Sequence, residues 1–247
     1  LRENKADLIA TKKMQLKQAD SVFQVMPEVI KTDSVKAEEQ TQENVNRLKA
    51  ELVINTTNIM DSHSDVHLKG IWNKTVKEQK NLYLLQEHKM TFDHIISDNV
   101  NAKVVEMKWS DLGFNYKGTT EALIFDSTID KGRNPFMFEQ YSKGYVKEHS
   151  VGMRYTKLEL AINSENKYDK EEKEVWDKYF DQIVNKEQAE EQGYFWAVQE
   201  AKVIEGSAVV KGSNHATPTI SVEAVKDTPT TEPTEVTQTI KRKLSVI

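Results

Sequence analysis

The sequence predicts an α+β protein whose core is a mostly antiparallel sheet or barrel with inserted helices. Between Leu52 and Val210, β-branched and apolar runs alternate with polar turn signals, which is typical of strands. A strongly amphipathic stretch at 167–193 and a shorter helical pattern near Pro135 interrupt these runs. Strands that dominate the middle of a chain, with helices between them, favour one sheet-based core over an alternating βαβ arrangement.

Length and composition set outer bounds on function. The chain has 247 residues, of which 38% are hydrophobic and 30% charged, enough for one large domain with solvated appendages. Its net charge of -5 provides no broad basic surface, so we expect no direct nucleic-acid binding. The absence of cysteine excludes thiol catalysis, disulfides and cysteine-ligated zinc.

The chain also lacks the apolar segments that membranes require. No run approaches the roughly 20 apolar residues that span a bilayer. The N-terminus has no apolar core of a secretion signal. These features predict a soluble protein inside the cell.

The first 50 residues are highly charged and read as helical. Apolar residues recur irregularly there, and a second helical pattern, "VKAEEQTQENVNRLKAEL", has few apolar positions. Two interpretations remain: a solvated helical extension, or an arm that docks on a partner surface. The irregular apolar positions are Leu8, Ile9, Met14, Leu16, Phe23 and Met26.

The strands are predicted in order along the middle of the chain. A polar turn, "DSHSDVHLKG", separates the first two of them. In the second, period-two alternation places His88 on the same face as Leu82 and Leu84. The predicted strands are 52–60, 81–88, 102–114, 120–129, 150–160 and 194–210.

Two helices are predicted between these strands. Pro135 suits the first turn of a helix within 134–148. The segment 167–193 carries an apolar stripe and ends at Gly193, a residue that often terminates helices. The stripe consists of Trp176, Tyr179, Phe180 and Ile183.

After about Thr217 the chain becomes rich in Thr, Pro, Glu and Val without periodicity, which predicts disorder. Its last residues, "IKRKLSVI", are interpreted as the end of an unstructured tail or as a short recognition peptide. The predicted organisation is therefore a helical extension at 1–50, a domain at 51–220 and a disordered tail at 221–247.

The first histidine pair has the residue types of a metal site. His63 and His67 lie close to Asp61 and Asp65 in sequence. On a strand or turn, however, a four-residue spacing does not bring ligands together as it does on a helix. We therefore expect a polar turn here and no bound metal or cofactor, with a metallohydrolase as a remote alternative.

His88 and Ser150 are the strongest catalytic candidates. A histidine at the boundary of a core is interpreted either as a hydrogen-bonded structural residue or as an imidazole that its surroundings can hold neutral, as a general base must be before it accepts a proton. A serine hydroxyl needs such an adjacent base to become nucleophilic. Ser150 begins a later strand, so sheet pairing can bring the two strand ends together. His149 is an alternative base, although neighbouring strand residues point to opposite faces.

The run "VIEGSAVV" adds an acid. Glu205 and Ser207 share one strand face with Val203 and Val209. A carboxylate among valines needs a partner, and the two interpretations are an ordinary salt bridge or a group that orients His88. Glu200 and Glu87 compete for that role.

Taken together, these segments resemble the prohead (procapsid-maturation) serine proteases of tailed phages, distant relatives of the herpesvirus assemblin proteases. The similar segments are "MDSHSDVHLKGIW", "LLQEHKM", "HSVGMRY" and "EAKVIEGSAVV" with "GSNHATPT", within roughly residues 52–220. By this resemblance His88 corresponds to the catalytic histidine, Ser150 to the nucleophile and Glu205 to the late acidic residue. The herpesvirus relatives use a second histidine as third member, which leaves His149 and His215 open.

The resemblance implies a function and a setting. It implies an assemblin-like fold and a serine endopeptidase that cleaves scaffold and major capsid protein inside the procapsid in the host cytoplasm. It also implies self-cleavage and self-association of the enzyme. It also implies that Gly152 allows a close backbone approach near the nucleophile, with Arg154 on the same strand face. The alternative is a protease-like but inactive scaffold or capsid-interior component.

Overall fold

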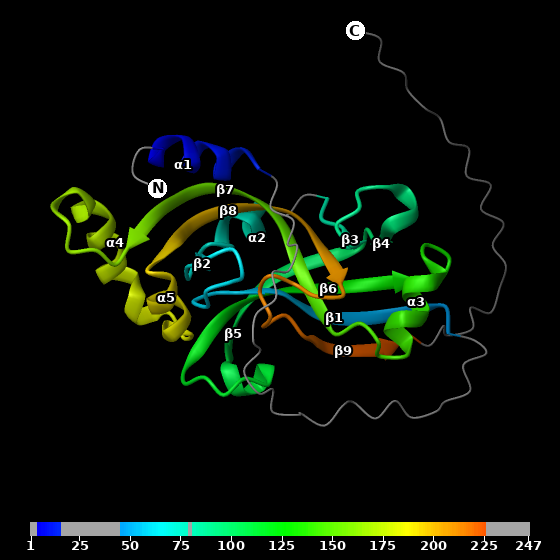
Figure 1. Ribbon diagram of the computed structural model, residues 1–247. Helices are drawn as coiled ribbons and strands as arrows, with labels where there is room; N and C mark the ends of the chain where they lie inside the picture. Colours follow the sequence, from blue (N-terminus) through cyan, green and yellow to red (C-terminus); the bar gives the residue numbers. More distant parts are fainter. Residues whose placement is uncertain (1–3, 16–44, 79–80, 226–247) are drawn as a thin grey trace, which may run out of the picture.

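Two β-sheets make up the body of the molecule (Figure 1). This computed structural model describes residues 4–15, 45–78 and 81–225. It has mostly antiparallel sheets and a few helices, as the predicted α+β class requires. In these residues no helix combines the length and the apolar character needed to cross a membrane.

The first sheet has four antiparallel strands in the order β5-β6-β1-β9. Two of its strands, β1 and β9, lie where the sequence predicted a helix and disorder. The predicted helix at 35–52 is wrong from Arg47 onward, where β1 begins, and the predicted disorder after Thr217 is wrong where β9 pairs with β1. Strand pairing and burial on a sheet override weak local preferences for helix or disorder. Composition alone therefore gave the wrong prediction for β1 and for β9. The strands are β1 (Arg47–Thr56), β5 (Val100–Lys108), β6 (Thr119–Asp130) and β9 (Thr219–Ala224).

The second sheet has five strands, with β8 at its centre. β7 pairs antiparallel with β8 along almost its whole length, while β2 and β3 pair parallel with the other side of β8. The predicted polar turn at 61–70 therefore contains a short strand, β2, because its residues bond to the long central strand. The strands are β2 (Asp65–His67), β3 (Leu84–Gln86), β4 (Ile95–Ser97), β7 (Glu148–Ile162) and β8 (Tyr194–Val209).

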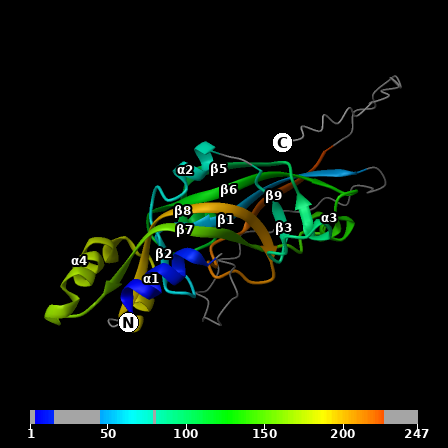
Figure 2. The same cartoon turned by 90° about the horizontal axis from the view of Figure 1, so that it is seen from above.

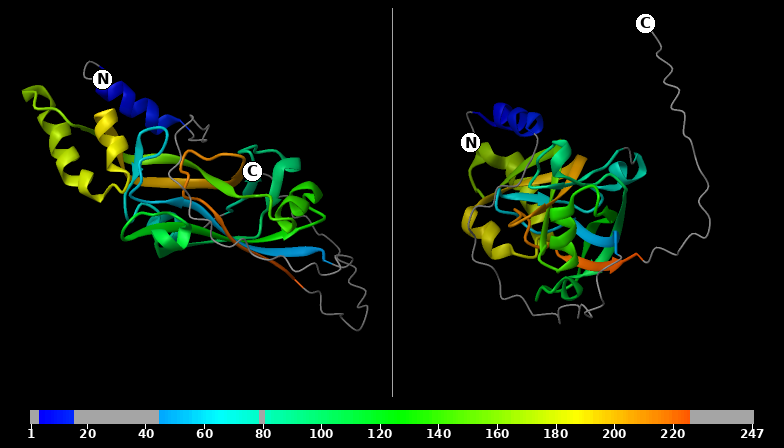
Figure 3. Two further views of the ribbon diagram at one scale, coloured as in Figure 1. Left: turned by 60° about the horizontal axis from the view of Figure 1, so that its bottom comes forward. Right: turned by 90° about the vertical axis from the view of Figure 1, so that its right-hand side faces the viewer.

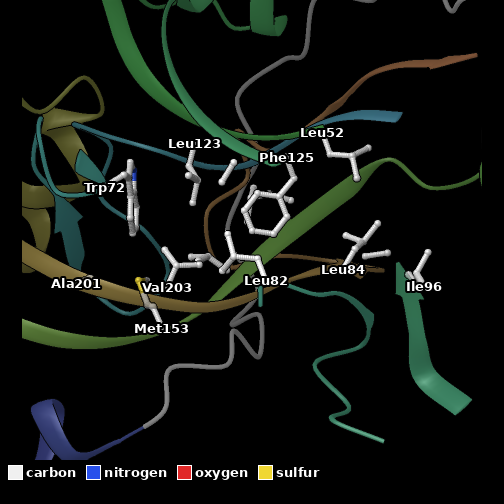
Figure 4. Packing of buried hydrophobic residues seen from close by; sticks show 14 of the residues in the cluster. Leu52, Trp72, Leu82, Leu84, Ile96, Leu123, Phe125, Met153, Ala201 and Val203 are labelled. Atoms are coloured by element: carbon white, nitrogen blue, oxygen red, sulfur yellow. The ribbon is translucent and has the colours of Figure 1, made fainter. Parts of the chain in front are cut away.

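The main hydrophobic core fills the space between the two sheets (Figure 4). Phe125 of β6 packs so closely on β8 that a Cβ at Gly206 would lie 2.7 Å from its ring. Even-numbered β8 residues at this end therefore face the core, and odd-numbered ones face away from the other sheet. Other core residues include Leu52, Leu84, Leu123, Val151, Met153 and Val203.

The helices lie around the edges of the sheets. In α3, Pro135 occupies the first turn as predicted, and the Asn134 side chain caps that turn by accepting a hydrogen bond from the Met137 amide at 3.0 Å. The first three helices along the chain are α1 (Lys5–Met14), α2 (Asn73–Glu78) and α3 (Pro135–Ser142). Short 3₁₀ turns lie at Phe92–His94, Trp109–Leu112, Lys167–Asp169 and Phe180–Gln182.

The predicted helix at 167–193 is two helices rather than one. α4 (Lys170–Tyr179) gives way to the 3₁₀ turn at Phe180, and α5 (Lys186–Gln192) follows. Gly193 ends α5 in a left-handed conformation, as its position predicted. Both helices lie at the end of the β7–β8 ladder where β7 leads into β8 (Figure 3). Ile183 and Trp176 are buried in a second, smaller core there.

Candidate functional site

The candidate site lies where β3 ends, beside the start of β7 and the end of β8 (Figure 1). β3 is shorter than predicted and stops at Gln86. Glu87 and His88 follow with φ angles of 52° and 55°, in the left-handed region that residues with a side chain rarely adopt. The predicted period-two face through His88 is therefore wrong, because the backbone turns before reaching it. Such strained backbone clusters at functional sites.

This turn delivers the His88 ring to a buried acid. His88 Nδ1 lies 2.6 Å from Glu205 Oε1, and the other carboxylate oxygen accepts a hydrogen bond of 2.6 Å from Ser207. The Ser207 hydroxyl in turn accepts from the His88 backbone N–H at 3.1 Å. Glu205 is fully buried and His88 is 9% exposed. A carboxylate can only accept, so a neutral His88 ring carries its proton on Nδ1, and Nε2 then holds the basic lone pair.

Gly152 provides the space for that carboxylate. It pairs with Glu205 across the β7–β8 ladder, and a Cβ on residue 152 would lie 1.9 Å from Glu205 Oε1. Glycine therefore permits a close approach here, but the group that approaches is the Glu205 side chain. This contact explains why a glycine interrupts a long strand.

Ser150 lies on the same face as this cluster. It pairs directly with Ser207 in the ladder, and side chains of directly opposed residues lie side by side, with Cβ atoms about 5 Å apart. Ser150 is 5% exposed. Within the described residues, the hydrogen bonds of the cluster join His88, Glu205 and Ser207 and do not include the Ser150 hydroxyl. We refer to His88, Ser150, Glu205 and Ser207 as the His88 cluster.

His149 belongs to the opposite face of β7. It is fully buried, its Nε2 lies 3.0 Å from the Tyr141 hydroxyl, and its Nδ1 lies 3.2 Å from the Thr217 carbonyl oxygen. Burial lowers the pKa of His149 to about 4. The alternation of strand residues thus separates His149 from Ser150, and His149 links α3 to the segment before β9.

The remaining alternatives for the acid or second histidine have other contacts. Glu200 pairs with Lys74 at 3.0 Å at the surface, and Glu87 accepts a hydrogen bond from the Val210 amide at 3.2 Å. His215 packs edge-on against Phe114, which belongs to a third hydrophobic cluster together with Trp109 and Ile124 of β6. Of the carboxylates considered, Glu205 is the one that contacts the His88 ring.

The residues considered for a metal site form a different buried network. His67 contacts Asn55 and the Tyr155 hydroxyl through its two ring nitrogens, at 3.1 and 3.2 Å. Tyr155 donates to Asp65 at 2.6 Å, and Lys12 of α1 pairs with the same carboxylate. Among the described residues no three His, Asp or Glu side chains are grouped as metal ligands would be. We call Asp65, His67, Tyr155 and Lys12 the Asp65 cluster.

Sequence reasoning missed two parts of these arrangements. It placed Ser207 on the face of Glu205 but gave it no role, whereas its hydroxyl joins Glu205 to the backbone of His88. It also missed the contact between Tyr155 and Asp65, which are 90 residues apart. Nothing in the local sequence around Tyr155 indicates that partner.

Comparisons with known proteins identify no relative, since no family model, no curated protein and no solved structure matches this chain.

Proposed function

We propose that this chain is a serine endopeptidase in which Ser150 is the nucleophile, His88 the general base and Glu205 the acid that orients the base. The observation that carries this proposal is the hydrogen bond between His88 Nδ1 and the fully buried Glu205, on the sheet face that also holds Ser150. An imidazole whose Nδ1–H is held by a carboxylate is ready to accept a proton on Nε2.

The chemistry follows the usual course of acyl transfer. Ser150 Oγ attacks the peptide carbonyl carbon while its proton passes to His88 Nε2. That proton then passes to the leaving amine as the C–N bond breaks, which leaves an ester on Ser150. Water hydrolyses the ester with His88 again acting as base, and Glu205 stabilises the imidazolium in both steps.

Ser150 is a better nucleophile candidate than its neighbour. The Ser207 hydroxyl is fully buried and already donates to Glu205 while accepting from the His88 amide. Removing it from those bonds would leave a buried carboxylate short of a donor, which is costly. Ser150 takes part in none of these bonds, so its hydroxyl is available for proton transfer.

The substrates proposed are the scaffold and major capsid protein of a phage procapsid in the host cytoplasm, with self-cleavage of the tail and self-association of the enzyme. This rests on the sequence resemblance to prohead proteases. The predicted tail is 221–247, of which 226–247 lie outside the described residues, so its removal is a matter for experiment. Intact mass of the wild type and of Ser150→Ala tests it: we expect the full tail only in Ser150→Ala.

A second function is favoured by one observation. All four side chains of the His88 cluster are less than 10% exposed, so a substrate would have to reach groups that the surrounding residues almost completely cover. A protease-like domain retained as an inactive scaffold or capsid-interior component would keep such a closed cluster for its stability.

Labelling with a fluorophosphonate, followed by peptide mass spectrometry, separates the two functions. We expect label on Ser150 in the wild type and in the surface control Ser142→Ala, and none in Ser150→Ala. Co-expression with capsid and scaffold proteins supplies the second readout, with processing abolished by Ser150→Ala while the domain stays folded. A folded wild type that never labels at Ser150, alone or assembled, would leave the inactive scaffold as the better account.

A further inference from the structure

Helix α1 lies along β7 and presents one face to the domain (Figures 1 and 2). Lys5 and Lys12 are seven residues apart, or about two helical turns, so they project from the same face. Leu8 and Ile9 between them are partly buried against the main core, yet no residue of α1 is fully buried. Apolar contact alone therefore holds this helix weakly.

The two lysines reach carboxylates that are buried in the domain. Lys12 pairs with Asp65, whose side chain is fully buried, and Lys5 pairs with Glu172 of α4, whose side chain is 9% exposed. Lys5 also contacts Glu171 at 3.4 Å. The hydrogen bond to Glu172 raises the pKa of the Lys5 ammonium group, which therefore stays charged.

Lys12 enters a site formed by Asp65, Tyr155 and Trp196, which we call the ammonium socket. Its floor is the Asp65 carboxylate, and the Lys12 nitrogen lies 4.9 Å from the Trp196 ring centre and 5.9 Å from that of Tyr155. A carboxylate attracts an ammonium ion by its charge, and the face of an aromatic ring attracts it through the ring quadrupole.

The domain holds this socket in place by its own contacts. The Tyr155 hydroxyl donates to Asp65 Oδ2 at 2.6 Å, and the Asp65 amide donates to the Asp61 side chain at 2.9 Å. Asp65 also pairs with Trp196 in the parallel β2–β8 ladder. None of these groups belongs to α1, so these contacts of Asp65 do not depend on the helix. Taking the Lys12 ammonium group away from a buried carboxylate is unfavourable, and the socket therefore favours an occupied state.

We propose that Asp65, Tyr155 and Trp196 form a binding site for the ammonium group of a lysine on a helix, and that α1 is its reversibly bound ligand. Lys12 supplies the group that is recognised, and Lys5 fixes the direction of the helix through α4. On this view the first helix is a docked arm that the domain can release without unfolding, and not an integral part of the sheet's packing. The proposal is independent of the proposed protease activity.

Hydrogen exchange of the full chain tests whether Lys12 holds the arm. Lys12→Met removes the charge and keeps an unbranched side chain, while Lys13→Met changes an exposed neighbour on the same helix. We expect Lys12→Met to raise amide exchange across 5–14 by at least about ten-fold while the β7–β8 ladder stays protected. Lys13→Met should exchange as the wild type does. Equal protection of α1 in all three proteins would overturn the proposal, and so would loss of protection in the β7–β8 ladder on release.

A peptide added in trans tests the binding site itself. Full-length Lys12→Met is titrated with a synthetic peptide of residues 1–15, and with the same peptide carrying methionine at position 12. We expect the lysine peptide to bind at least about ten-fold more tightly, with a change in tryptophan fluorescence from Trp196. Equal affinities, or no binding of either peptide, would mean that Asp65 is not an ammonium receptor.

Discussion

Two clusters on opposite faces of β7 each combine a histidine, a buried carboxylate and a hydroxyl group, in different geometries. The His88 cluster joins a histidine directly to a carboxylate, and serine hydroxyls lie beside the pair. In the Asp65 cluster a tyrosine hydroxyl lies between the histidine and the carboxylate, and a lysine pairs with the acid. The order of the groups therefore decides what each cluster can do. The His88 ring, held by Glu205, can accept a proton from a nucleophile. The Asp65 carboxylate, already paired with Lys12, stabilises the contact between α1 and the domain.

The tyrosine strengthens this distinction. Burial, and then the negative charge of Asp65, raise the pKa of the Tyr155 hydroxyl, so it remains a donor to that carboxylate. His67 is thereby separated from the acid by a group that does not release its proton. The same histidine and carboxylate that suggested a metal site in the sequence are thus fixed in a structural network.

The largest expected difference between the clusters is in reaction rate. His88→Gln should lower fluorophosphonate labelling of Ser150 by about 10²- to 10⁴-fold, because the base is lost. His67→Gln, the matched change in the other cluster, should leave the labelling rate per folded molecule unchanged. It should still lower the free energy of unfolding by about 1–3 kcal/mol, since a buried hydroxyl loses a partner. If both variants lost labelling rate to a similar degree, the two clusters would not differ in function as proposed.

The next largest expected effect is the contribution of His149 to the pH dependence of folding. Its folded pKa of about 4 lies below the ordinary value of 6.5, because burial disfavours the charged ring. The unfolded chain therefore binds this proton first as the pH falls. The stabilisation is complete above pH 6.5 and is lost as the pH falls toward 4, and the total is on the order of 3 kcal/mol.

Urea unfolding of the wild type and of His149→Gln between pH 7 and pH 4 measures that slope. The variant should be less stable at pH 7 and flatter over this range, because it cannot bind the proton. An unchanged slope in His149→Gln would assign the acid sensitivity to other groups.

The smallest expected effect concerns the space that Gly152 leaves for the Glu205 carboxylate. Gly152→Ala places a methyl group against a carboxylate that His88 and Ser207 hold from the other side, so the side chain has little freedom to move. We expect a loss of about 1–3 kcal/mol in unfolding free energy by thermal denaturation, together with slower labelling of Ser150.

Gly132→Ala is the control for that variant. Its new methyl group would meet only the end of the Asp130 side chain, at 3.1 Å, and that side chain lies at an exposed turn where it can move. If Gly152→Ala were as stable as the Gly132→Ala control, the Glu205 carboxylate would be able to move away. The contacts of Glu205 with His88 and Ser207 would then not fix its position.

Local pattern in the sequence determined the class of the fold and the strands that carry the candidate residues. Alternation identified the long strands of Ser150 and Glu205, Pro135 marked the start of α3, and Gly193 marked the end of α5. These features depend on near neighbours along the chain, where side-chain period and backbone preference act directly.

Only the tertiary structure decided which of these residues meet. The left-handed turn at His88, the space that Gly152 leaves for Glu205, and the insertion of Lys12 beside Asp65 each join segments more than 50 residues apart. Pairing across sheets also made strands of β2 and β9, whose local composition resembles turn or tail. Such contacts arise from burial and hydrogen bonding in the folded chain, and these energies have no counterpart in the pattern of neighbouring residues.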